Sequence, residues 1–223
     1  MRTALRVVFF ISPLRPKNWN NTAKLKMINK LSCLVVNKLL NEGNISYEEK
    51  DLYVYGLFMF ISSTLYFILS SIFGLIFGCL FESIIFYFAF QLIWKYAGGY
   101  HASTEIRCEI LSTLSILLCV LIIRILKEHN FNLVLLCITG FSIVVIVALC
   151  PLDTPEKPLS VNEFKYFRKI SWIILLVLVV IVIISYCFHL NIILIPCCIS
   201  LLLESILLIA GKIKRYYGQQ ANN

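Results

Sequence analysis

Between Leu52 and Tyr96 the chain reads LYVYGLFMFISSTLYFILSSIFGLIFGCLFESIIFYFAFQLIWKY, a nearly continuous run of apolar and aromatic residues. One helical crossing of a bilayer core needs about 20 residues, so this run is long enough for two crossings. We place the division between them near Ser70, Ser71 and Gly74. Because lipid offers no hydrogen-bond partner to a free backbone group, each crossing is expected to be a helix.

The rest of the chain has the same character. Of its 223 residues, 60% are hydrophobic and only 14% are charged, and the mean hydropathy is +0.86. Further apolar segments of spanning length lie near residues 110–126, 131–150, 170–188 and 192–210. The predicted fold class is therefore all-α, a polytopic membrane helical bundle with about six transmembrane helices.

An amphipathic helix is predicted before the first span, over residues 23–40. Apolar residues recur there at helical spacing, with lysines between them, as is typical of a helix that lies in the membrane interface. The apolar positions are Leu25, Ile28, Leu31, Val35 and Leu39. The expected organisation is an N-terminal cytoplasmic segment over 1–50, a six-helix transmembrane domain over 51–211 and a basic cytoplasmic tail over 212–223.

The positive charges predict the orientation of the bundle. With both termini in the cytoplasm, all of the 20 Lys and Arg residues except Arg124 and Lys127 fall on the inner side. This agrees with the positive-inside rule and predicts a multi-pass protein of the cell membrane. The net charge of +8 is explained without a nucleic-acid partner, and the basic inner surface is expected to face anionic membrane lipid or an acidic ligand.

The inner loop between the second and third spans contains a histidine and a cysteine. It reads KYAGGYHASTEIRC from Lys95 to Cys108. A cysteine activated by a histidine is an arrangement used for covalent catalysis, and the cation of Arg107 would favour the Cys108 thiolate. The simpler interpretation is a packed thiol together with an interfacial histidine. On this topology His101 is the only histidine on the inner side.

The spacing of the pair requires a break in the helix. Seven helical residues separate His101 and Cys108 by about 10.5 Å along the axis, which is too far for proton transfer. We therefore predict that the segment between them is not one straight helix, and that Gly98 and Gly99 form a sharp turn. The chain has no Cys-x-x-Cys or His-x-x-x-His spacing, so no metal or other cofactor is expected.

Two motifs in this order, the segment from Lys95 to Cys108 and the later PLDTPEKP of Pro151 to Pro158, resemble the accessory gene regulator protein B (AgrB) family. The resemblance implies a membrane cysteine endopeptidase that cuts a quorum-sensing propeptide and helps form its cyclic thiolactone or lactone. It also implies that His101 and Cys108 are the catalytic pair, at the cytoplasmic face, and that the protein forms a homodimer.

The resemblance also indicates residues that support the pair. Gly99 matches the glycine of the family motif, but the family's arginine seven residues before the histidine is replaced by Trp94. Either Lys95 supplies that charge or Trp94 anchors the span at the interface. Substrate binding or support is expected from Lys95, Gly99, Asp153 and Lys157.

Several alternatives stay open at this stage. A third residue that orients His101 could be Asp153, Glu105 or Glu109. The cations Lys157, Lys165, Arg168 and Lys169 could steer an acidic part of the propeptide, or could only anchor the inner face.

Two other classes of protein compete with the peptidase. Glu82 and Glu204 interrupt predicted spans, and such carboxylates would fit a small transporter or peptide exporter. A non-catalytic membrane scaffold is the third alternative.

Gly74 and Gly78, at four-residue spacing, offer a close-packing face for a dimer.

Overall fold

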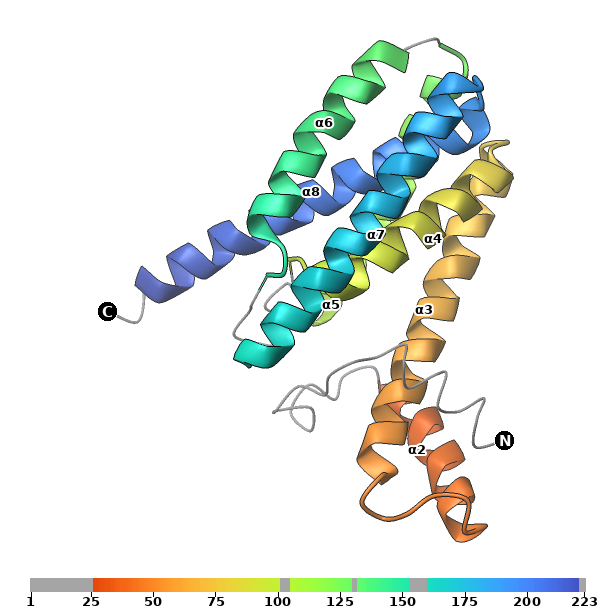
Figure 1. Cartoon of the computed structure of the whole chain (residues 1–223). Helices are drawn as coiled ribbons and strands as arrows, with labels where there is room; N and C mark the ends of the chain where they lie inside the picture. Colours follow the sequence, from red (N-terminus) through yellow and green to blue (C-terminus); the bar gives the residue numbers. More distant parts are fainter. Residues whose placement is uncertain (1–25, 101–104, 130–131, 153–159, 221–223) are drawn as a thin grey trace. The chain divides into compact units, whose positions relative to one another are not determined.

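The structure is a computed structural model that describes residues 26–100, 105–129, 132–152 and 160–220 (Figure 1). All regular secondary structure in these residues is helical. The helices are α2 (Lys26–Asn41), α3 (Lys50–Ile76), α4 (Leu80–Ala97), α5 (Glu105–Lys127), α6 (Asn132–Leu149), α7 (Val161–Cys187) and α8 (Asn191–Gln220). The chain forms two compact units, Met1–Ile68 and Leu69–Asn223, which are described separately.

The first unit contains α2 and most of α3. A small core of Val36, Ile45 and Val54 joins the two helices, and Val36 is almost fully buried. On another face of α2, Leu31 and Leu34 are half exposed or more. The predicted helix is thus confirmed over Lys26–Asn41, and Val36 rather than Leu31 packs inward; its position in the membrane interface stays a prediction.

The turn between α3 and α4 lies later than predicted. Helix α3 continues through Ser70 and Gly74 to Ile76, and the chain turns at Gly78, whose φ is +69°. A methyl group at Gly74 would collide with the Ser83 hydroxyl, and the Ser70 hydroxyl donates to the Ser83 carbonyl at 3.3 Å. Both glycines therefore serve this turn, and they give no support to a dimer face.

Helix α8 is the centre of the second unit. Helices α4, α5, α6 and α7 all pack against it. Two thirds of the residues in the most apolar stretch of α8 are buried. The largest fully buried apolar side chains of this core include Phe86, Ile123, Leu201 and Leu208. The last turns of α8 extend past the other helices in Figure 1 and carry the basic residues of the predicted tail.

Four of the described helices are long and apolar enough to cross a membrane: α3, most of α5, α7 and most of α8. In α6, the segment Leu133–Leu149 is apolar but shorter. Helix α4 is not among the four, because Glu82, Gln91 and Lys95 lower its apolar character. The all-α membrane character is therefore confirmed, whereas the count of six spans and the inner position of the termini stay predictions.

Candidate active site

The site is built around the end of α4, where the glycine pair stops the helix. The N–H of Gly98 donates to the Trp94 carbonyl at 3.0 Å, and Gly98 has φ +77° and ψ −163°. That combination is open essentially only to glycine. The predicted sharp turn is therefore confirmed, since α4 ends at Ala97 and Gly98 has a positive φ.

The two sequence motifs meet at this turn. The N–H of Leu152, from the second motif, donates to the Ala97 carbonyl at 2.8 Å. A methyl group at Gly98 would lie 3.1 Å from the Leu152 carbonyl oxygen, so only glycine allows this approach. A hydrogen bond between backbones thus joins segments that are more than fifty residues apart in the sequence.

Helix α8 contacts the turn from another direction. A methyl group at Gly211 would collide with the Leu152 side chain and would lie 3.2 Å from both the carbonyl carbon and the oxygen of Gly99. Sequence reasoning missed Gly211. Its only signal is its place at the boundary between the apolar part of α8 and the basic tail. The Gly98–Gly99 backbone is consequently enclosed by Leu152 and by α8.

Aromatic rings surround the same turn. The Lys214 ammonium of α8 lies 5.8 Å from the centre of the Tyr100 ring, next to His101 in the chain. Lys95 lies 5.1 Å from the ring centre of Tyr96, which in turn contacts Phe167 of α7. Lys95 lies in the last turn of α4, close to this turn in the chain.

Cys108 lies in the first turns of α5 and is half-buried, beside the exposed Arg107. The other candidate thiols differ. Burial raises the pKa of the Cys79 thiol, and the nearby Glu82 carboxylate raises it further. Of the cysteines in the later helices and turns, Cys137 and Cys187 are exposed, whereas Cys79, Cys119, Cys150, Cys197 and Cys198 are buried.

Three predicted site residues, His101, Asp153 and Lys157, lie outside the described residues, as does the side chain of Glu105. The pairing of His101 with Cys108 and the shape of the segment between them stay predictions. Glu109 is half-buried on α5. Within the described ranges, no three His, Cys, Asp or Glu side chains lie together in a way that could hold a metal ion.

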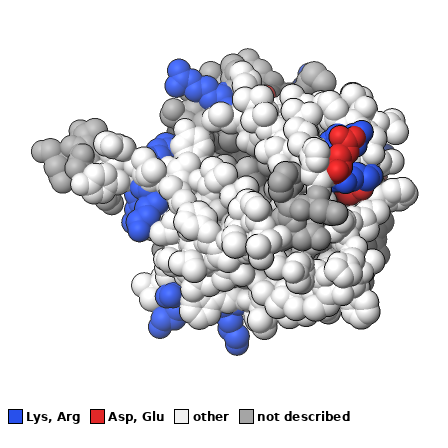
Figure 2. All heavy atoms as spheres, turned by 90° about the horizontal axis from the view of Figure 1, so that it is seen from above, with Lys and Arg blue, Asp and Glu red and all other residues white. Residues whose placement is uncertain are grey.

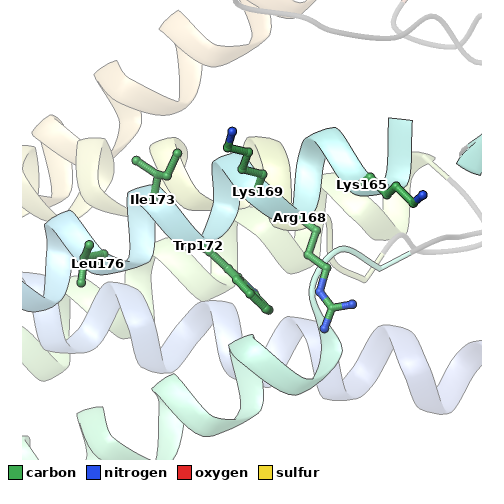
Figure 3. Close-up of a pocket in the computed structure, with 6 residues that line it drawn as sticks. All are labelled: Lys165, Arg168, Lys169, Trp172, Ile173 and Leu176. Carbon is green, nitrogen blue, oxygen red and sulfur yellow. The ribbon is translucent and has the colours of Figure 1, made fainter. Parts of the chain in front are cut away.

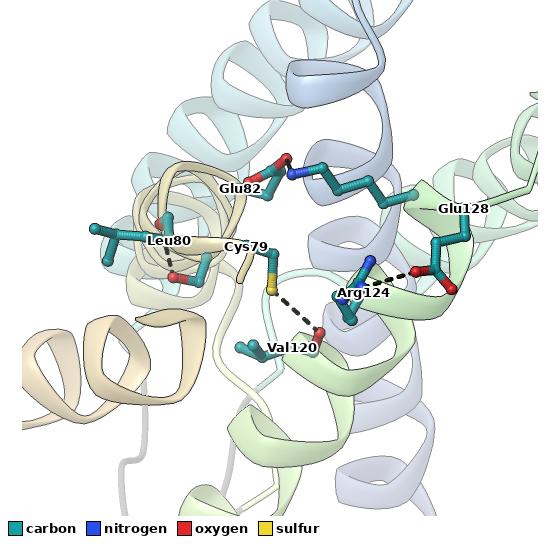
Figure 4. Close-up of polar contacts among 8 residues, drawn as sticks. Cys79, Leu80, Glu82, Val120, Arg124 and Glu128 are labelled. Atoms are coloured by element: carbon teal, nitrogen blue, oxygen red, sulfur yellow. Dashed lines mark hydrogen bonds and ion pairs between the residues drawn. The ribbon is translucent and has the colours of Figure 1, made fainter. Parts of the chain in front are cut away.

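A network of charged side chains lies at the other ends of α4 and α5 (Figure 4). Lys127 Nζ lies 2.6 Å from a carboxylate oxygen of Glu82, which is almost fully buried. Arg124 pairs with Glu128 at 2.7 Å, and the Cys79 thiol points at the Val120 carbonyl. The two cations predicted to fall on the outer side are therefore both neutralised by carboxylates.

The surface view agrees with this distribution of charge. Seen from above, most of the visible surface is uncharged, and acidic side chains gather mainly at one place beside basic ones (Figure 2). Glu204 is different from all of these groups. Its side chain is fully buried in α8, and neither carboxylate oxygen has a hydrogen-bond partner among the described residues.

Long apolar helices packed around a central helix define a multi-pass membrane protein. The family model of Accessory gene regulator B matches residues 32–208, a range that contains both sequence motifs, Cys108 and the α8 core. The chain belongs to this family.

Two relatives from Clostridium perfringens support the assignment. "Putative AgrB-like protein 2" of strain 13 / Type A is 28% identical over 148 residues, which cover 64% of this chain and 69% of that protein. "Putative AgrB-like protein" of strain SM101 / Type A is 27% identical over the same length and with the same coverage. No solved structure matches the chain.

Proposed function

We propose that this chain is a cysteine endopeptidase of the cell membrane that cuts an autoinducing-peptide precursor at the cytoplasmic face and promotes its cyclisation for quorum sensing. Membership of the Accessory gene regulator B family supports this function. The observation that carries the proposal is the hydrogen bond from Leu152 to Ala97, which joins the two family motifs four residues before His101.

The proposed chemistry uses His101 as base and Cys108 as nucleophile. His101 accepts the thiol proton, and the thiolate attacks a peptide carbonyl of the propeptide. The C–N bond breaks, and the C-terminal fragment leaves as an amine after it takes the proton from His101. The N-terminal fragment is then held on Cys108 as a thioester.

The second step decides the product. If a cysteine or serine side chain of the bound peptide attacks the thioester, its proton passes to His101 and the Cys108 thiolate leaves. The product is a cyclic thiolactone or lactone that keeps an activated ester without external ATP. If water attacks instead, the product is linear, so exclusion of water from the site favours cyclisation.

The surroundings of Cys108 fit a nucleophile. Its thiol is half-buried, and it lies near the start of a helix that is long and apolar enough to span the membrane. Arg107, which precedes it in the chain, is an exposed cation. We assign substrate support to Lys95 and Gly99 at the end of α4, and to Asp153 and Lys157 of the second motif.

The test uses the full chain in liposomes with the propeptide that its own gene neighbourhood encodes. Cleavage is followed by mass spectrometry for the parent, Cys108→Ala and Cys108→Ser, and for the control Cys33→Ala, which removes another half-buried thiol. Cleavage by the parent and the control alone, with a thioester on Cys108, supports the proposal. Undiminished cleavage by Cys108→Ala would refute it.

One observation keeps a transporter as the second candidate, namely the buried carboxylate of Glu204 in α8, for which the described residues offer no hydrogen-bond partner. Glu82, the other carboxylate of that hypothesis, already has an ion-pair partner in Lys127. A transporter that uses Glu204 would lose function in Glu204→Gln, whereas the proposed peptidase would still cut its substrate.

A further inference from the structure

Helix α7 carries an exposed groove that the peptidase chemistry does not use (Figure 3). Six side chains of this one helix line it, three cationic and three apolar: Lys165, Arg168, Lys169, Trp172, Ile173 and Leu176. All six are exposed. Because they follow one another at spacings of three or four residues, they form a single stripe along the helix.

The order of the stripe matches the layers of a membrane. Helix α7 has 27 residues and is about 40 Å long, whereas a bilayer core is about 30 Å thick. Its first turns must therefore extend into the headgroup layer if its apolar part, which begins near Ile170, spans the core. The three cations then lie at headgroup depth, and Ile173 and Leu176 lie at acyl-chain depth.

The described part of the chain shows no ion pair to the cations of the groove. Among the described residues, none of Lys165, Arg168 and Lys169 forms an ion pair. The acidic residue nearest in sequence, Glu163, accepts a hydrogen bond at 2.8 Å from the N–H of Ser160, which caps the helix. Three positive charges thus lie within two turns of α7, without a carboxylate partner in the part of the chain that the structure describes.

Trp172 lies between the cationic half of the groove and its apolar half. The Arg168 guanidinium lies 4.8 Å from the centre of the Trp172 ring, and both side chains point the same way from the helix in Figure 3. This contact holds the guanidinium over the ring. A tryptophan at this depth is typical of a membrane interface.

We propose that this groove binds an anionic phospholipid. Lys165, Arg168 and Lys169 bind the headgroup phosphate, and an acyl chain lies along Trp172, Ile173 and Leu176. An acidic peptide would match the cations but would leave the apolar half uncovered, whereas a lipid matches both halves. Cys108 is not among the side chains that line the groove, and the proposal does not depend on the proposed peptidase activity.

The test places the full chain in phosphatidylcholine vesicles that contain brominated phosphatidylglycerol or brominated phosphatidylcholine. Trp19→Phe and Trp94→Phe leave Trp172 as the one tryptophan, and bromine quenches its fluorescence only from bound lipid. We expect phosphatidylglycerol to bind about five-fold more tightly than phosphatidylcholine, in line with the attraction of a few basic residues to anionic lipid.

A matched pair of triple variants makes the test specific. Lys165→Gln, Arg168→Gln and Lys169→Gln together should abolish the preference for phosphatidylglycerol. The control Lys30→Gln, Lys38→Gln and Lys212→Gln removes the same net charge at residues that do not line the groove, and it should leave the preference within two-fold of the parent. Equal quenching by both lipids in the parent, or equal loss in both triple variants, would overturn the proposal.

A second measurement does not depend on tryptophan substitution. Native mass spectrometry of otherwise unsubstituted protein, released from vesicles of equal phosphatidylglycerol and phosphatidylcholine, counts the lipids that stay bound. The parent should keep phosphatidylglycerol, and the α7 triple variant should lose it while the control keeps it. If the α7 variant binds as much phosphatidylglycerol as the control, the groove is not the site.

Discussion

The N–H of Leu152 lies 2.8 Å from the carbonyl oxygen of Ala97, and the α-carbon of Gly98 faces the Leu152 carbonyl beside this bond. The carbonyls in the last turn of a helix have no partner within the helix. One of these carbonyls, that of Ala97 at the end of α4, accepts its hydrogen bond from Leu152, in the segment that follows α6. The direction in which the chain leaves α4 toward His101 is therefore fixed jointly by two distant parts of the sequence.

Gly98→Ala should disrupt this arrangement. The residue has φ +77° and ψ −163°, a conformation that costs other residues about 1–3 kcal/mol, and the added methyl group would lie 3.1 Å from the Leu152 carbonyl oxygen. We expect thermal stability in detergent to fall by about that amount, and propeptide cleavage to fall at least about ten-fold because His101 is displaced.

Gly140→Ala is the matched control for this prediction. Gly140 lies within α6, and a methyl group there would have no heavy atom within 4 Å. Alanine favours a helix over glycine by about 1 kcal/mol, so this variant should be as stable as the parent or more stable, with full cleavage. Equal activity of the two variants would show that the conformation of Gly98 does not position the site.

The Lys127–Glu82 pair should stabilise the packing of α4 and α5. Lys127→Met leaves the buried Glu82 carboxylate without its cation, and such a loss is strongly unfavourable in a buried site. Because Lys127 is itself 42% exposed, water screens part of the effect, and we expect a loss of about 2 kcal/mol. Thermal unfolding in detergent measures it.

A double-mutant cycle separates the pair from general effects. Lys127→Met combined with Glu82→Gln should recover part of the loss, since no buried charge then lacks a partner. The exposed pair of Arg124 and Glu128 is the control, and its removal should cost at most about 0.5 kcal/mol. Strict additivity of the Lys127 and Glu82 substitutions would contradict a coupling between them.

The later helices of the fold follow directly from local sequence patterns. Helices α5 to α8 were predictable because each contains an apolar run close to the thickness of a membrane. The break near Ser70 and Gly74 was wrong for a physical reason. Serine and glycine residues often mark the end of a helix. Here, however, the Ser70 hydroxyl donates a hydrogen bond to the Ser83 carbonyl, and the absence of a side chain at Gly74 leaves space for the Ser83 side chain.

The site was predictable only in its local part. The glycine turn before His101 follows from the residues themselves, but contacts between distant segments carry no local signal. Neither the fit of Gly211 against Gly99 nor the pairing of Glu82 with Lys127 could be read from spacing. The exposure of Cys137 and Cys187 could not be predicted for a related reason: the sequence of an apolar helix in lipid does not reveal which of its faces packs inward.

Cysteine reactivity should follow exposure and thiolate content. Burial and the Glu82 carboxylate raise the pKa of Cys79, so at pH 8 its thiolate fraction is lower than that of an ordinary thiol. Iodoacetamide in detergent should therefore alkylate the half-buried Cys108 at least about ten-fold faster than Cys79. Peptide mass spectrometry at several times gives both rates, with the half-buried Cys33 as the reference, and equal rates for Cys79 and Cys108 would contradict the prediction.

Glu204→Met should make the protein more stable. The Glu204 side chain is fully buried without a hydrogen-bond partner among the described residues, and an unsatisfied buried polar group costs about 1–3 kcal/mol. Methionine has a similar shape and needs no partner, so unfolding should shift to higher temperature. Glu128→Met, at an exposed carboxylate, is the control and should not raise stability. Loss of stability in Glu204→Met would mean that the carboxylate has a partner in the membrane. A variant that is more stable and still cleaves its propeptide would show that the peptidase does not need Glu204.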